Sequence, residues 1–244
     1  MRTIYLIIFG LIIWSCTSNK KITEQIEEIH SSPDQINTPL EIAFVKGKSF
    51  NHPSFAIWVE DLEGNYIETL FVTQYVATGK FGHGESEPGK WKNESDYVRR
   101  PASLPYWAHK RNIQAPDGLY IPSPETAVPD ALTGATPQTG FILSTGTKVK
   151  SGEKFSVLME INQAWDSNNF WTNNKYPDDK DYFTSLQPAL VYSVTIEAGS
   201  EQKEFVMNPI GHSHPSGKNG ELFKDLSTIT TAKEIAANIV VQLK

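Results

Sequence analysis

The stretch SFAIWVEDLEGNYIETLFVTQY, residues 54–75, decides the fold class of this chain. Two apolar runs rich in β-branched and aromatic residues flank a polar turn at Glu63-Gly64-Asn65. Runs of this kind, joined by a short turn that contains glycine, predict a β-hairpin. The segment LEIAFVKG, residues 40–47, has the same composition and predicts a strand that precedes the hairpin.

More strand patterns follow in the second half of the chain. They are GFILSTG (140–146), KFSVLMEIN (154–162), PALVYSVTIEAG (188–199), KEFVMN (203–208) and ANIVVQL (237–243). About eight short strands, joined by turns rich in glycine, proline and asparagine, predict a mainly β protein. The expected fold is an antiparallel β-sandwich of the immunoglobulin or fibronectin type.

Between the two groups of strands lies a segment with little strand pattern, residues 79–139. A stretch of this length without regular structure is uncommon inside a compact domain. We expect a long, proline-rich loop insertion that packs across one face or end of the sandwich and contains a short helix after Pro105. Proline rings fix φ and lower the entropy lost when the loop is ordered.

The N-terminal sequence MRTIYLIIFGLIIWSC indicates export. A basic start followed by a short apolar run predicts a bacterial secretory signal over residues 1–15, too short to span a membrane comfortably. Cys16, the one cysteine of the chain, lies where a lipoprotein signal is cleaved and acylated. We therefore expect a lipid-anchored protein in the periplasm or at the cell surface; a cleavable signal with an incidental cysteine is the alternative.

Residues 16–38 are polar and predict a tether, which leaves residues 39–244 as a single domain. A single cysteine excludes an intramolecular disulfide and a cysteine-ligated cluster. The formal net charge of −6 argues against a nucleic-acid partner, which would require clustered lysine and arginine.

The sequence Asp130-Ala131-Leu132-Thr133-Gly134-Ala135-Thr136 is the clearest candidate site. Two threonine hydroxyls lie beside small residues, and glycine permits a positive φ at position 134. A hydroxyl on a small-residue turn is accessible to a modifying enzyme, and the upstream carboxylate can orient it. The alternative is an Asx-type turn in which Asp130 accepts backbone N–H groups and nothing is attached.

This motif resembles the acceptor site for covalent flavin mononucleotide (FMN) in bacterial extracytosolic electron-transfer proteins. The resemblance implies that a flavin transferase joins the FMN phosphate to the hydroxyl of Thr136. Asp130, Thr133, Gly134 and Ala135 then form the recognition context. The expected function is electron relay outside the cytoplasm, with a membrane electron-transfer protein as partner.

The wider chain, from Leu40 to Leu243, resembles a family of predicted periplasmic proteins, domain of unknown function 2271. The resemblance rests on RRPASLPYWAHKR, PDALTGATPQTG, MEINQAWDSNNFWTNNKYPDD, QPALVYSVTI and GHSHPSGKNGEL. It implies proximity to flavin transferases and membrane electron-transfer proteins, and it implies no settled activity.

A bound isoalloxazine ring needs a stacking surface and hydrogen-bond donors. Trp107 and His109 precede the motif and are candidates for these contacts, and Arg99 and Arg100 are candidates to pair with the phosphate. Ordinary packing of each aromatic side chain is the alternative. Further aromatic residues, Trp165, Phe170 and Trp171, follow the motif.

The segment GHSHPSG places His212 and His214 two residues apart, a spacing that presents two imidazoles to one metal ion if the segment is a strand. A hydrogen-bonded turn is the more ordinary interpretation, and we expect no metal cofactor. No hydrolase motif such as G-x-S-x-G or H-E-x-x-H is present. The alternatives to a flavoprotein are therefore a β-sandwich lipoprotein that binds a glycan, peptide or protein partner, and a histidine-based metal-binding protein.

Overall fold

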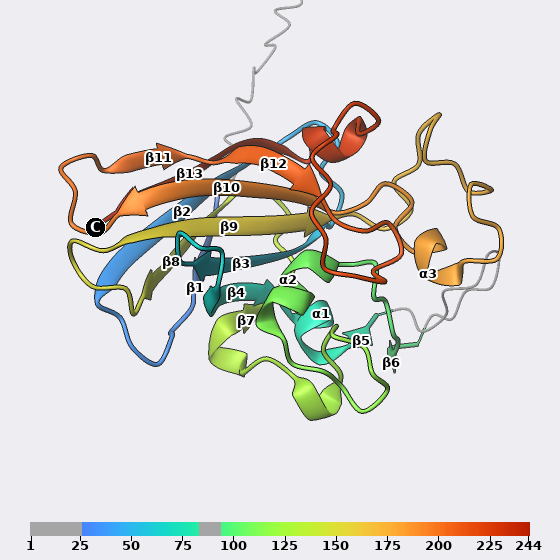
Figure 1. Ribbon diagram of the computed structural model, residues 1–244, viewed down its shortest axis with the longest axis horizontal. Coiled ribbons are helices and arrows are strands. Elements are labelled where there is room, and N and C mark those ends of the chain that lie inside the picture. The colour runs from blue at the N-terminus through green and yellow to red at the C-terminus, as the bar shows by residue number, and fades with distance from the viewer. Residues whose placement is uncertain (1–25, 83–93) are drawn as a thin grey trace, which may run out of the picture.

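The structure is a computed structural model that describes residues 26–82 and 94–244 (Figure 1). The signal sequence, Cys16 and the first part of the tether lie outside the described residues. Within the described part of the chain, no helix has the length and apolar character needed to cross a membrane.

The first of two packed sheets has five strands in the order β1-β8-β2-β13-β11. These strands are β1 (Glu27–His30), β2 (Thr38–Lys46), β8 (Phe141–Thr147), β11 (Glu204–Val206) and β13 (Ala236–Leu243). All neighbours pair antiparallel except β1, which pairs parallel with β8 at the edge.

The second sheet has six strands in the order β12-β10-β9-β3-β4-β7. These strands are β3 (Ser54–Glu60), β4 (Tyr66–Thr73), β7 (Thr133–Gly134), β9 (Lys154–Asn162), β10 (Leu190–Glu197) and β12 (Asn208–His212). The expected hairpin is β3 and β4. The second sheet also contains one parallel pair, β4 with β7, and this pair lies at its edge. Both sheets are therefore mixed, and the prediction of a purely antiparallel sandwich is wrong at two edges.

The remaining elements are short. They are a two-stranded sheet of β5 (Lys80–Phe81) and β6 (Asp96–Tyr97), the helices α1 (Gln74–Thr78), α2 (Pro105–Arg111) and α3 (Lys180–Phe183), and the 3₁₀ turns η1 (Pro124–Thr126), η2 (Asp130–Leu132) and η3 (Thr231–Glu234). The short helix expected after Pro105 is confirmed as α2, with proline at the first helical position, where its missing N–H is not needed.

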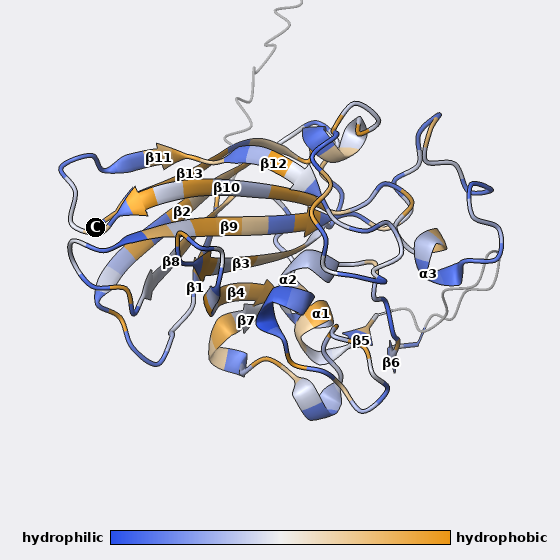
Figure 2. Ribbon diagram, viewed as in Figure 1, coloured by the Kyte–Doolittle hydropathy of each residue, from blue (hydrophilic) through white to orange (hydrophobic). Residues whose placement is uncertain are grey.

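The main hydrophobic core lies between the two sheets. In β9, alternate residues Phe155, Val157, Met159 and Ile161 face this core, as the period of two requires. Phe141 of the first sheet stacks on the ring of Phe55 in the second, with centroids 5.1 Å apart. Figure 2 shows hydrophobic residues concentrated along the central strands and hydrophilic residues in the loops around α3.

A second core lies on the outer face of the six-stranded sheet, between that sheet and the insertion. Trp58 of β3 and Leu158 of β9 face outward and pack with Leu104 and Trp107 from the insertion. In Figure 1 the insertion, green to yellow-green, lies against this sheet. Coverage of both faces explains why FAIWV is a continuous apolar run rather than an alternating one.

Part of the expected tether belongs to the fold. Glu27–His30 forms β1, paired with β8 from Glu27↔Phe141 to His30↔Ser144, and Thr38 begins β2. The sequence EEIH has no strand pattern, so its place in the sheet comes from backbone pairing. The chain thus enters the sandwich directly beside the strand that follows the Thr-Gly-Ala-Thr motif.

Candidate functional site

The candidate acceptor segment, residues 133–140, connects the two sheets. β7 extends the six-stranded sheet with the register Val72↔Thr133 and Thr73↔Gly134, and the chain then crosses to β8 in the five-stranded sheet. Thr136 lies in this crossing. The motif is therefore a bridge along one side of the sandwich rather than the tip of a surface turn.

Gly134 is required by close approach and not by its backbone angle. Its φ is not positive, contrary to expectation. A Cβ atom at this position would lie 3.0 Å from Cε2 and 3.1 Å from Cζ of Phe71, whose ring is fully buried. A larger residue would require the Phe71 ring to shift by a few tenths of an ångström, so close packing favours glycine here.

The Thr136 hydroxyl is available for chemistry but shielded from solvent. The residue is 7% exposed, while its neighbour Ala135 is exposed. No described residue hydrogen bonds to the Thr136 hydroxyl, whereas its carbonyl oxygen accepts from Gln138 Nε2 at 3.2 Å. Unlike Thr139 Oγ1, the Thr136 oxygen is not one of the fully buried side-chain atoms without a partner, so a small part of it remains accessible.

The upstream part of the motif does not form the Asx-type turn. The Asp130 carboxylate is exposed and accepts no hydrogen bond from the described residues. Thr133 Oγ1 instead donates to the backbone carbonyl of Asp130 at 3.2 Å. Asp130 thus remains free to contact a partner in solution.

A carboxylate from β1 holds the crossing closed. Glu27 Oε1 accepts from the backbone N–H of Gln138 at 2.6 Å and of Thr139 at 3.1 Å. The Gln138 side-chain oxygen in turn contacts His52 Nε2 at 2.6 Å. His52 is thus a basic side chain placed beside the acceptor segment, and neither Glu27 nor His52 carries a motif that sequence analysis would have recognised.

Replacement of Glu27 by alanine is expected to loosen this segment without unfolding the sandwich. The variant loses two hydrogen bonds to a charged acceptor, each worth about 1.5–3 kcal/mol. Hydrogen exchange of the Gln138 and Thr139 amides should become about tenfold faster or more. Glu28→Ala, at the neighbouring exposed position, is the matched control and should leave both rates unchanged. Equal rates in the two variants would show that Glu27 does not hold the segment.

The predicted ring-binding residues are held by structural contacts of α2. Trp107 is fully buried and donates through Nε1 to Thr69 Oγ1 at 2.9 Å. His109 donates through Nδ1 to the Pro105 carbonyl at 2.7 Å and packs against Tyr120, with ring centroids 4.4 Å apart. These contacts give both residues structural roles on α2.

The predicted phosphate ligands have other contacts. Arg99 forms an ion pair with Asp117 at 2.5 Å and donates to the carbonyl of Ile121 at 2.8 Å. The Arg100 guanidinium lies over the rings of Phe81 and Trp165, at 4.3 and 5.8 Å from their centroids. Both of these Arg99 contacts are therefore made within the insertion itself.

The two histidines lie at the far edge of the sheet from the motif. The pairing registers place six residues in one row across the sheet: Thr133, Val72, Ala56, Glu160, Val191 and Gly211. Five strand spacings of about 4.8 Å separate the ends of this row by about 24 Å. The histidine segment and the acceptor segment are therefore separate sites.

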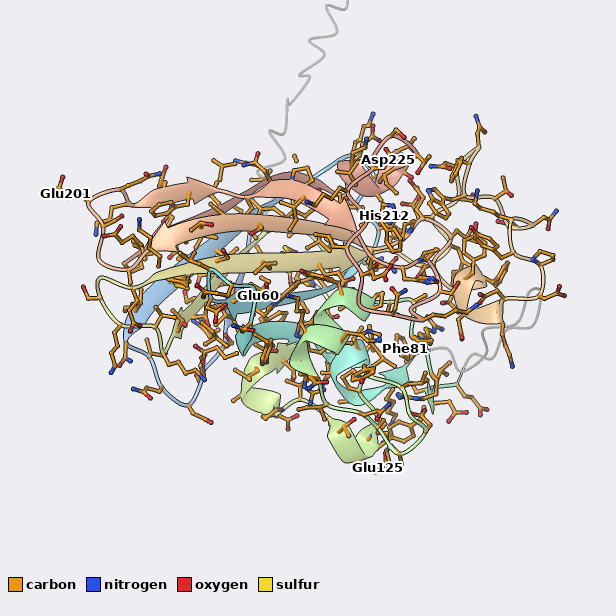
Figure 3. The ribbon with its side chains drawn as sticks, in the orientation of Figure 1. Glu60, Phe81, Glu125, Glu201, His212 and Asp225 are labelled. Atoms are coloured by element: carbon orange, nitrogen blue, oxygen red, sulfur yellow. The ribbon has the colours of Figure 1, made fainter. Side chains whose placement is uncertain are left out.

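His212 and His214 do not converge on one point. His212, labelled in Figure 3, donates through Nδ1 to the Ser213 carbonyl at 2.8 Å. Its ring stacks on Phe223. His214 Nδ1 instead accepts from the backbone N–H of Ser216 at 3.1 Å. Burial lowers the pKa of both rings. Within residues 26–82 and 94–244, no group of three or more His, Cys, Asp or Glu is arranged to hold a metal ion.

Glu160 joins the insertion to the sheet. It lies on the outer face of β9, fully buried, and its two oxygens accept from the backbone N–H of Tyr106 at 3.1 Å and of Trp107 at 2.8 Å. These are otherwise unpaired donors of the first turn of α2. Burial raises the pKa of Glu160 to about 8, although these two N–H groups and the Ser213 hydroxyl oppose the shift.

A second buried acid, Glu60, lies beneath the insertion. Glu60 is buried, accepts from Trp58 Nε1 at 2.8 Å and pairs with Lys110 at 3.2 Å. Its burial arises because the insertion covers this end of β3. Both acids fix the position of α2 on the sheet.

Comparisons with protein-family models, curated proteins and solved structures return no match for this chain. The two resemblances therefore rest on the residues quoted for them.

Proposed function

We propose that this protein carries FMN covalently on Thr136 and relays electrons outside the cytoplasm. The observation that carries the proposal is the Thr136 hydroxyl, which has no hydrogen-bond partner among the described residues while the backbone around it is held at Gln138 and Thr139. Gly134 packs closely on Phe71, which favours a small residue at this position of the motif.

The attachment is a phosphoryl transfer with a defined balance. The Oγ–P bond forms at Thr136, and a phosphoanhydride bond of an activated FMN donor, such as a flavin dinucleotide, breaks. The hydroxyl proton passes to a base of the transferase, and the donor's nucleotide leaves. The product is a phosphodiester, which fixes the flavin to the protein whatever the affinity of its pocket.

The residues around Thr136 fit a phosphodiester. The ring nitrogens of His52 lie 3.2 Å from Asn51 Oδ1 and 2.6 Å from Gln138 Oε1. An imidazole N–H beside the crossing is a hydrogen-bond donor for a phosphate oxygen. The bound flavin would supply reversible reduction, and this chain would bind it, orient it and keep it from diffusing away.

Export and anchoring complete the proposal. The signal over residues 1–15 and acylation of Cys16 would place the protein at a membrane, in reach of a membrane electron-transfer partner. A dissociable cofactor is lost outside the cytoplasm, so a covalent link suits this location. Within the sandwich class, the immunoglobulin or fibronectin type also remains our proposal.

The test is the mass of the full chain produced with and without a co-expressed flavin transferase. We expect the mature protein to gain the mass of FMN less one water only in the presence of the transferase. It should also keep flavin absorbance after denaturation and gel filtration. An unmodified mass under both conditions would refute the proposal.

A second candidate function is a binding module, favoured by one surface. A hollow of about 550 Å³ lies beside α3 and is lined by Tyr176, Asp178, Asp179, Asp181 and Lys218, among others. Tyr176 is 42% exposed there. An exposed ring beside charged groups suits a glycan, peptide or protein partner. This function predicts colourless protein whose partner binding survives Thr136→Ala.

A further inference from the structure

A column of rings begins at the surface of α1. Tyr75 is 46% exposed and stacks on Phe81, with centroids 6.2 Å apart and an angle of 23° between the planes. Phe81 is buried, and the Arg100 guanidinium lies 4.3 Å from its centroid on the way to Trp165. Figure 3 labels Phe81 beside α1 and β5. The exposed ring is thus backed by a buried ring and a cation.

The register places the backbone of Tyr75 near the acceptor segment. Thr73 pairs with Gly134 in a parallel ladder, and α1 contacts β7. Tyr75 and Thr136 each lie two residues beyond that pair. Two residues of chain span at most about 7 Å, so both remain close to the paired position. The ribityl phosphate arm of FMN is long enough to carry a ring from Thr136 to a neighbour of this kind.

The other exposed aromatic rings already carry a cation. In the described part of the chain, four aromatic side chains are strongly exposed: Tyr75, Tyr97, Phe170 and Tyr176. Lys80 lies 5.7 Å from the Tyr97 ring, and Lys175 lies 3.4 Å from the Phe170 ring and 5.9 Å from the Tyr176 ring. Among these four and within the described residues, Tyr75 has no lysine or arginine over its ring; its ring contacts Phe81, and the residue is 46% exposed.

We propose that Tyr75 is the stacking surface for the isoalloxazine ring of FMN linked at Thr136. This inference rests on the proposed function and names the ring site that Trp107 and His109 do not provide. Phe81 and Arg100 fix the Tyr75 ring from behind. Stacking on an electron-rich phenol stabilises the electron-poor oxidised flavin relative to the reduced form, so it lowers the reduction potential.

The experiment uses full-length protein loaded with FMN by a co-expressed flavin transferase, in three forms: wild type, Tyr75→Ala and Tyr176→Ala. The loaded fraction is measured by intact mass, flavin fluorescence at equal loading, and the midpoint potential by redox titration. We expect a several-fold rise in fluorescence and a higher potential in Tyr75→Ala, because a stacked tyrosine quenches flavin emission. Tyr176→Ala, similar in exposure and distant in the fold, should match wild type.

The outcomes separate the two proposals. Covalent FMN in all three proteins, with fluorescence and potential unchanged in Tyr75→Ala, would overturn the stacking site and leave the attachment intact. Absence of FMN from wild type would overturn the attachment itself and the stacking site with it. Tyr75→Trp should restore quenching, which a merely structural role of Tyr75 would not predict.

Discussion

Replacement of Thr136 by alanine is expected to abolish covalent flavin attachment completely. The variant lacks the oxygen that forms the bond to phosphorus, and no other residue occupies the final position of the motif. Thr136→Ser keeps a hydroxyl at the same position and should retain attachment. The measurement is intact mass after co-expression with a flavin transferase.

The neighbouring threonines are the matched controls for this variant. Thr139 lies three residues further along, and its Oγ1 atom is buried without a hydrogen-bond partner in the described residues. Thr139→Ala should therefore be flavinylated like wild type and fold at least as well. Thr133→Ala removes a hydrogen bond to the Asp130 carbonyl and should reduce attachment without eliminating it. Full loading of Thr136→Ala would mean that another residue is the acceptor.

The stability of the protein is expected to fall as the pH rises from about 5 to about 8, because of Glu160. The pKa of this buried carboxyl is about 8 in the folded protein against an ordinary value of 4.5. The folded state therefore holds a proton that the unfolded state releases. The free energy of unfolding from this group is greatest below pH 4.5 and declines by about 1.4 kcal/mol per pH unit until the folded pKa is passed.

Glu160→Gln isolates this effect. The amide does not ionise, and it leaves one backbone N–H of α2 without an acceptor, which costs about 1–3 kcal/mol at every pH. Urea denaturation should show that wild type is more stable than Glu160→Gln at pH 5. The difference in the free energy of unfolding between the two proteins should shrink toward pH 8. His212 and His214, whose pKa values are lowered, change stability in both proteins alike. If the free energy of unfolding depended on pH in the same way in wild type and in Glu160→Gln, the assignment of this pH dependence to Glu160 would be contradicted.

The strands were predictable from the sequence because their side chains alternate or run apolar. β3, β4, β9 and β10 match the expected segments, and the turn before β4 follows from Gly64, whose φ is 82°. Pairing partners were not predictable, because parallel contacts such as β1 with β8 depend on backbone groups alone. The polar segment EEIH thus became an edge strand rather than a tether.

The candidate site was predicted in part. The motif marks Thr136 and Gly134, but sequence spacing does not show which side chains surround them. Trp107 and His109 are close in sequence to the motif and are held by α2 against the sheet and the loop that contains Gly220. Tyr75 comes from α1, which follows β4 directly, and the β4–β7 pairing brings this helix near the motif.

The attachment of FMN to Thr136 is the central claim, and peptide mapping of the loaded protein tests it most directly. Trypsin should release residues 112–148 as one peptide, since no lysine or arginine lies between Arg111 and Lys148. We predict that this peptide carries all the flavin absorbance and that fragmentation places the added FMN phosphate on Thr136. Flavin on Thr133, Thr139 or another peptide, or a peptide of unmodified mass from protein made with an active transferase, would contradict the account.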